Sequence, residues 1–169
     1  MVKKLIILSL LVITAITLRS CGIYSFTGGD TGNAKTIQVD YFPNTATLVE
    51  PGLSQKFTED LRDLFLTQTN LTSVPSNGDL QFEGEITGYR INPMSATAQQ
   101  TAAQNRLTIT VNCRYFNRDE EAKSFEKSFS FYYDYPADAQ LTGSILDGAF
   151  EEIIERITQD IFSASVGAW

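Results

Sequence analysis

Two carboxylates one residue apart are the side chains of this sequence with the clearest catalytic potential. Glu83 and Glu85 fall in a segment that alternates apolar and polar residues, so they share one face of a strand about 7 Å apart. A pair of carboxylates at this separation suits the acid and base of a glycoside hydrolase. The surrounding pattern is polar, which favours an ordinary solvated sheet face. A carboxylate-based hydrolase therefore stays open as an alternative.

The composition excludes most other kinds of active site. The 169 residues contain no histidine, which removes the Ser-His-Asp triad, the Cys-His pair and His-ligated metal sites. There is no calcium-binding loop and no glycine-rich phosphate loop in the sequence. A net charge of −7 argues against nucleic acid as a partner. We therefore predict no enzyme, no cofactor and no metal, and a role in binding or assembly.

A second group of chemically informative residues is basic. Six cations fall on or beside the central strands: Arg90, Arg106, Arg114, Arg118, Lys123 and Lys127. Basic side chains gathered on one face bind the phosphate or carboxylate groups of an anionic ligand. We name Arg90, Arg106, Arg114 and Lys127 as candidate contacts. Because the strand phase puts Arg114 on the polar face and Lys127 on the apolar one, simple charge balance is the alternative.

The N-terminus has the pattern of an export signal. Two lysines precede an apolar run from Leu5 to Leu18, which is too short to span a bilayer and typical of a signal peptide. The run ends in Leu18-Arg19-Ser20-Cys21-Gly22, which resembles the lipobox of bacterial lipoproteins, although Arg19 replaces the usual small residue. We predict a signal peptide at residues 1–20 and lipidation of Cys21. A plain signal peptide with an incidental Cys21 is the alternative.

Removal of the signal would change the charge and the cysteine content. Residues 1–20 contain three basic side chains and no acid, so the net charge moves from −7 to −10. Such a surface repels anionic membranes, and attachment then depends on the lipid. With Cys21 acylated, Cys113 has no partner for an internal disulfide. Its place in an apolar alternation predicts a small core residue.

The rest of the sequence predicts one folded domain behind a short tether. Residues 27–35 are polar and rich in glycine, as in flexible linkers, so we assign residues 21–35 to the lipidated cysteine and its tether. Residues 36–169 form the domain, without an internal repeat or a second boundary. A domain of this size buries enough surface to fold by itself.

Hydrophobic periodicity predicts four strands and two helices in this domain. Alternating segments place the strands at residues 36–42, 80–91, 107–115 and 125–133. Apolar residues at helical spacing place the helices from about Pro51 and from about Ser144. The order is β-α-β-β-β-α. One apolar sheet face and two amphipathic helices predict an α+β fold, a two-layer sandwich of two helices packed on a four-stranded sheet.

Local signals refine these elements. Gly88 is expected to mark a bulge in the second strand. Ser144 and Asp147 resemble a capping box at the start of the last helix. Glu152 and Arg156 are expected to pair on the outer side of that helix.

The connection between the second and third strands is expected to be unusually long. Residues 93–105 contain no charge and many small side chains. Hairpin loops have two to five residues, and longer ones are functional or disordered. An uncharged loop of this kind suits a position inside a protein cavity. It is interpreted either as a partner contact or as a simple surface connection.

Three segments together resemble a known family. They are Cys21-Gly22-Ile23-Tyr24-Ser25-Phe26-Thr27-Gly28, Thr36-Ile37-Gln38-Val39-Asp40-Tyr41-Phe42-Pro43-Asn44 and Gly84-Glu85-Ile86-Thr87-Gly88-Tyr89. With the order of the elements, they look like the lipopolysaccharide-assembly lipoprotein (LptE) family, in its Bacteroidetes branch. The resemblance covers essentially the whole chain after the signal peptide.

The resemblance implies a periplasm-facing lipoprotein of the outer membrane, anchored by Cys21. It implies a plug inside a large β-barrel partner of the LptD type, which supports barrel assembly and aids delivery of lipopolysaccharide to the cell surface. Lipopolysaccharide contact in the family involves basic residues, but no single Arg or Lys here aligns with such a position. The alternative is a periplasmic lipoprotein that binds another ligand or envelope partner without a barrel.

Overall fold

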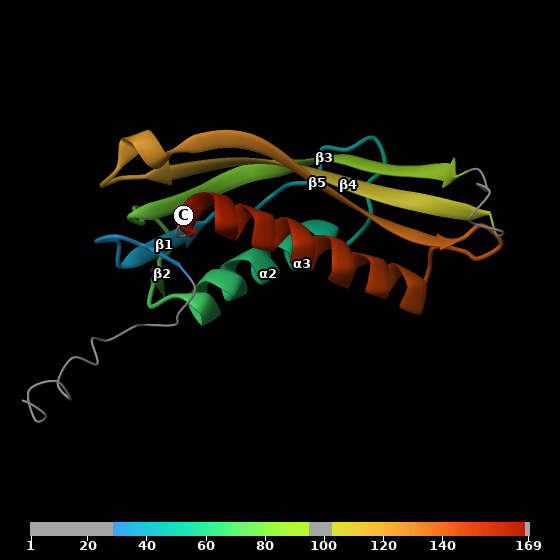
Figure 1. The fold of residues 1–169 in the computed structure, drawn as a ribbon, viewed down its shortest axis with the longest axis horizontal. Helices are drawn as coiled ribbons and strands as arrows, with labels where there is room; N and C mark the ends of the chain where they lie inside the picture. Colours follow the sequence, from blue (N-terminus) through green and yellow to red (C-terminus); the bar gives the residue numbers. More distant parts are fainter. Residues whose placement is uncertain (1–28, 95–102, 168–169) are drawn as a thin grey trace, which may run out of the picture.

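A mixed sheet of five strands packs against two helices (Figure 1). The structure is a computed structural model that describes residues 29–94 and 103–167. The strands are β1 (Thr36–Val39), β2 (Thr72–Ser73), β3 (Leu80–Met94), β4 (Gln104–Asn117) and β5 (Phe125–Pro136). The helices are α2 (Leu53–Gln68), α3 (Ser144–Val166) and the short 3₁₀ helix η1 (Glu121–Lys123). These layers confirm the predicted α+β sandwich.

The strand order in the sheet is β2-β1-β3-β4-β5. β1 runs parallel to β2 and β3, because the chain passes through α2 before it returns to the sheet. β4 pairs antiparallel with both β3 and β5. The predicted count of four strands is one too low. β2 has only two residues, both exposed, and two residues are too few to show an alternation.

β3 and β4 extend beyond their predicted ends. Pro93 pairs with Asn105, and Met94 pairs with Gln104. The expected loop over residues 93–105 is therefore wrong at both ends, and residues 95–102 lie outside the described residues. The pattern misses these ends because residues 91–94 are exposed throughout, so burial imposes no alternation on them.

A bulge in β3 decides which side chains share a face. As predicted, it lies at Gly88: the pairing with β4 shifts between Ile86 and Gly88 and leaves Thr87 without an opposite residue. The shift reverses the phase of the strand. Tyr89 is consequently buried on the helix side, whereas Arg90 lies on the same face as Glu83.

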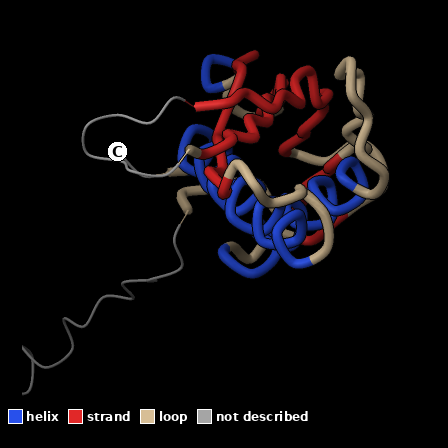
Figure 2. The backbone as a smooth tube through the Cα atoms, turned by 90° about the vertical axis from the view of Figure 1, so that its right-hand side faces the viewer, coloured by secondary structure: helices blue, strands red, loops and turns tan. Residues whose placement is uncertain are grey.

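The helices bury the apolar stripes predicted from their spacing, and both lie on the same side of the sheet (Figure 2). α2 buries Leu53, Phe57, Leu61 and Phe65, and α3 buries Ile153, Ile154, Ile157 and Ile161. Aromatic rings connect the layers. The ring centre of Phe65 lies 4.7 Å from that of Phe82 and 5.0 Å from that of Phe162. Each such pair contributes about 0.5–1.5 kcal/mol beyond area burial.

The prediction that Cys113 is a small core residue is confirmed. Its side chain in β4 is fully buried, and burial raises the pKa of its thiol to about 12. The thiol therefore stays protonated and unreactive at neutral pH.

Each of the two helices begins after a glycine, and no side-chain hydrogen bond caps either N-terminus. α2 follows Gly52 with φ 84°, and α3 follows Gly143 with φ 54°. Positive φ strains other residues, so glycine sets both starts. Ser144 is the first helical residue and makes no capping bond, so the predicted capping box is wrong. Arg156 pairs with Asp160 at 3.7 Å in place of the expected Glu152.

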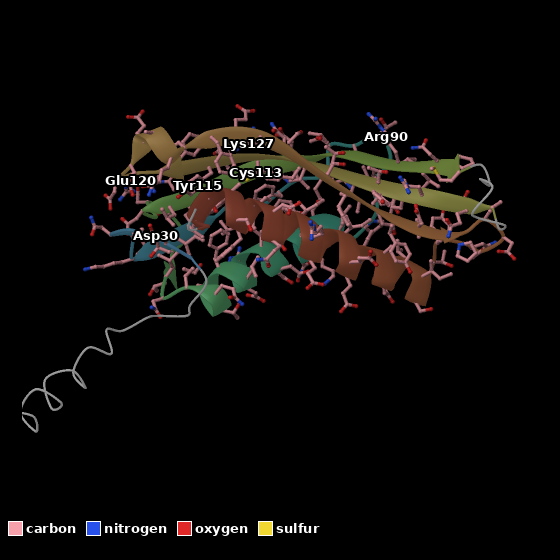
Figure 3. The ribbon with its side chains drawn as sticks, in the orientation of Figure 1. Asp30, Arg90, Cys113, Tyr115, Glu120 and Lys127 are labelled. Atoms are coloured by element: carbon pink, nitrogen blue, oxygen red, sulfur yellow. The ribbon has the colours of Figure 1, made fainter. Side chains whose placement is uncertain are left out.

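The chain enters the domain beside the C-terminal end of α3. The Asp30 backbone N–H donates to the Val166 carbonyl at 2.7 Å. A Cβ on Gly29 would lie only 2.9 Å from Val166, so the chain packs closely there. Residues 29–35, which belong to the predicted tether, thus contact the domain. Asp30 and Glu120 lie at the same end of the molecule, away from the far ends of β3 and β4 (Figures 1 and 3).

Candidate interaction surface on the open face of the sheet

One face of the sheet is left uncovered by α2 and α3 (Figure 1). We call it the open face. Strand register assigns to it alternate residues of the three long strands, which are mostly polar. They include Gln81, Glu83, Glu85, Arg90 and Asn92 of β3, Gln104, Arg106, Thr108, Thr110, Asn112 and Arg114 of β4, and Glu126, Ser128, Ser130, Tyr132 and Asp134 of β5, together with the apolar Met94 and Phe116.

The two carboxylates singled out from the sequence share one arginine. Arg114 Nε lies 2.8 Å from Glu83 Oε1, and its Nη1 lies 3.5 Å from Glu85 Oε1. Glu126 approaches the same guanidinium at 4.0 Å. The hydrogen bond to Glu83 raises the pKa of Arg114, so the cation is permanent. An ion-paired sheet surface accounts for these carboxylates.

A second ion pair lies toward the far ends of β4 and β5. Arg106 donates to both carboxylate oxygens of Asp134, from Nε at 2.7 Å and from Nη2 at 2.8 Å. Its guanidinium also lies 3.6 Å from the ring centre of Tyr132. The hydrogen bond to Asp134 raises the pKa of Arg106. Between the two ion pairs, the Thr110 and Ser130 hydroxyls lie 3.1 Å apart. The open face is thus hydrophilic, with most of its charges matched.

Three of the four predicted anion contacts, Arg90, Arg106 and Arg114, share the open face, whereas Lys127 does not. Arg106 and Arg114 are held by carboxylates, as described above. Arg90 lies on β3 at the open face, and no carboxylate of the described residues lies within ion-pair distance of it (Figure 3). Lys127 lies opposite Cys113, hence on the helix-side phase, 5.1 Å from the ring centre of Phe125. Contact of these cations with an anionic ligand stays a prediction.

The other two cations of the sequence analysis are also paired. Arg118 lies 3.6 Å from Asp79, and Lys123 lies 2.8 Å from Glu120. Cys21 and the predicted signal peptide lie outside the described residues. Among residues 29–94 and 103–167 there is no cluster of three or more metal-binding side chains. No helix in that part of the chain is long and apolar enough to cross a membrane.

Sequence reasoning missed a groove beside β3. It has a volume of about 290 Å³ and is lined by Thr47, Leu48 and residues 87–92. The segment after Asn44 leaves β3 there, so the groove opens along the edge of the strand. The exposed apolar side chains of its lining, Leu48 and Ile91, are the signal that was available in the sequence.

Several solved structures are similar to this chain. The hypothetical protein CT253 from Chlamydia trachomatis has a TM-score of 0.51 at 11% identity, over 78% of this chain and 98% of that chain. Two others have TM-scores below 0.5. PelC from Paraburkholderia phytofirmans scores 0.48 at 9% identity, covering 80% and 92% of the chains. Rare lipoprotein B from Shewanella oneidensis scores 0.39 at 14% identity, covering 76% and 90%.

The family is identified from the sequence itself. The model of the lipopolysaccharide-assembly family LptE matches residues 34–165, which is most of the chain. The protein therefore belongs to the LptE family of non-enzymatic lipopolysaccharide-assembly lipoproteins. Comparison with curated proteins gives no significant match. Placement in the Bacteroidetes branch stays a prediction.

Proposed function

We propose that this protein is an outer-membrane lipoprotein subunit of the lipopolysaccharide export translocon. In this proposal Cys21 carries the lipid anchor, the domain faces the periplasm, and a β-barrel partner of the LptD type encloses it. The domain plugs that barrel, supports its assembly and aids delivery of lipopolysaccharide to the cell surface. Membership of the LptE family supports this general role.

The observation that supports a barrel partner is the hydrophilic open face. The interior of a large membrane barrel is polar and filled with water. A sheet face with ion pairs and paired hydroxyls can lie against such a wall with most of its charges matched, Arg90 excepted. An apolar open face would instead need a hydrophobic partner or a third layer of secondary structure to cover it. The described residues form no such third layer.

The test is purification of the full-length, lipidated protein from outer membranes in mild detergent. We expect a β-barrel protein of the lipopolysaccharide-export type to be recovered in equal amount. Recovery of the lipoprotein alone, after crosslinking has preserved complexes and with the anchor intact, would contradict the proposal. It would favour the independent periplasmic binder.

A pair of matched variants assigns the contact to the open face. Thr108→Lys adds a long cation near the centre of that face, and Thr67→Lys adds the same group to the exposed side of α2. We expect the first variant to lower barrel recovery and the second to leave it unchanged. Equal recovery with both variants would remove the open face from the interface.

A further inference from the structure

The edge of β3 beyond Ile86 has no partner strand among the described residues. β1 pairs with β3 only from Leu80 to Phe82. At Ile86 the backbone N–H donates to the Pro43 carbonyl, and the Ile86 carbonyl accepts from the Thr45 N–H. Beyond this point β3 pairs with β4 alone, over its whole remaining length. A free strand edge therefore runs from Thr87 to Met94.

The backbone groups along this edge are able to pair with another strand. Ile86 directs its N–H and C=O groups away from β4. Because the bulge at Thr87 reverses the phase, Tyr89 and Ile91 do the same, while Pro93 offers only a carbonyl. The edge thus alternates donors and acceptors, which matches another polypeptide backbone. A phosphate group only accepts hydrogen bonds, so the free carbonyls oppose it.

Apolar side chains flank the edge. Leu48 and Ile91 line the 290 Å³ groove and are 55% and 41% exposed. They would pack against alternate side chains of an added strand, which is how strand addition gains specificity. β5 forms the other edge of the sheet and exposes one large apolar side chain, Tyr132, on the open face. The two edges therefore differ in what they offer a partner.

The charge beside this edge indicates which kind of segment it would bind. Arg90 is the charged residue of the groove lining, and no described carboxylate lies within ion-pair distance of it. The other two arginines of the open face, Arg106 and Arg114, are both paired with carboxylates. Two copies joined antiparallel about Arg90 would bring two arginines together, and like charges directly opposite are destabilising. A segment with a carboxylate at that place complements the edge.

We propose that the β3 edge from Thr87 to Met94 binds an extended segment of the barrel partner as an added strand. The segment carries aliphatic side chains toward Leu48 and Ile91 and a carboxylate toward Arg90. This inference rests on the proposed function, because it takes the barrel as the source of the segment. It adds a backbone-mediated contact at the sheet edge to the contact at the open face.

The experiment uses full-length, lipidated protein in native outer membranes. Ile91→Pro removes an edge N–H, and Ile91→Ala shortens the same side chain but keeps that N–H. Ser128→Pro makes the matched change on the β5 edge, where alternation directs the Ser128 N–H outward. Proline is tolerated at strand edges, and Pro93 already lies in this one. Unchanged thermal unfolding of each variant shows that the fold is intact.

We expect Ile91→Pro to lower barrel recovery about tenfold, as loss of one or two backbone hydrogen bonds would. Ile91→Ala, which loses only the side-chain contact, should lower recovery less than Ile91→Pro does, and Ser128→Pro should stay within about twofold of the unmodified protein. Arg90→Glu, an exposed change with little effect on folding, should also lower recovery. A photo-crosslinking residue at position 91 should join one short stretch of the barrel sequence, and the same residue at position 128 should not.

The outcomes separate this inference from the proposed function. If the barrel is recovered normally with Ile91→Pro, or position 91 crosslinks to lipopolysaccharide or to no polypeptide, the edge proposal is wrong and the barrel assignment stands. If the unmodified protein recovers no barrel, the proposed function is wrong, and the barrel is also excluded as the source of the added strand. Crosslinks between position 91 of two copies would contradict the barrel segment as the added strand and would indicate self-association instead.

Discussion

Replacement of Asp79 by alanine tests the link that joins the first strand to the middle of the sheet. Asp79 precedes β3, and its Oδ2 accepts hydrogen bonds from the Lys35 N–H (3.0 Å), the Thr36 N–H (3.0 Å) and the Thr36 hydroxyl (2.7 Å). The Asp79 N–H donates back to the Thr36 hydroxyl at 2.9 Å. One carboxylate thus fastens the start of β1, at the end where the chain enters the domain.

The size of the effect follows from these bonds. A hydrogen bond to a charged group is worth about 1.5–3 kcal/mol when it is buried. The Asp79 side chain is 27% exposed, so water can replace part of each bond and solvent weakens the pair with Arg118. We therefore expect Asp79→Ala to lower the free energy of unfolding by about 2–3 kcal/mol. For a domain of this size, that corresponds to a fall in Tm of about 4–12 °C.

The pH dependence gives a second readout of the same contact. The hydrogen bonds from Lys35 and Thr36 lower the pKa of Asp79 below its ordinary value of 3.8. A group with a lowered pKa contributes stability that is fully present above its unfolded value and lost as pH falls through its folded value. The Tm difference between the unmodified protein and Asp79→Ala should therefore be constant from pH 7 to about pH 5 and should shrink below about pH 4.

The assay is thermal unfolding followed by circular dichroism between pH 7 and pH 3. Asp138→Ala is the control, because Asp138 is an exposed carboxylate for which no side-chain bond is described. We expect the control to change Tm by less than about 2 °C. Equal Tm values for both variants at pH 7, or a difference that persists unchanged at pH 3, would refute the reasoning.

Three further predictions concern two glycines and the two cysteines. Gly84→Ala should destabilise the protein by about 3 kcal/mol or more in denaturant unfolding, because its Cβ would overlap the Asn112 carbonyl. Gly88→Ala meets only the Thr110 side chain at 3.0 Å and should cost less than half as much; equal costs would contradict this. The Cys113 thiol should react with a thiol reagent at pH 8 only when the protein unfolds, since burial raises its pKa to about 12, and fast labelling of folded protein would be inconsistent with that burial. Cys21→Ala should abolish acyl labelling and membrane retention, and unchanged labelling would refute the lipobox interpretation.

The sequence by itself determined the parts of this protein that depend on local periodicity. Apolar residues at helical spacing place Leu53, Phe57, Leu61 and Phe65 on one side of α2, and the observed burial agrees. Strict alternation in β4 likewise predicts the burial of Cys113. Such patterns are readable because burial of one face imposes a period of 3.6 or 2 on the chain. The family resemblance also needed only the sequence.

Tertiary structure decided what these elements do together. The two residues of β2 and the exposed end of β3 carry no periodic signal, because no layer covers them. Helix starts depended on the φ angles of Gly52 and Gly143, which residue spacing does not reveal. Sheet register, not sequence distance, pairs Arg114 with Glu83 and Arg106 with Asp134 and puts Lys127 on the other face. The free edge beside Arg90 likewise exists only because β1 ends after four residues, a consequence of long-range pairing that no local pattern contains.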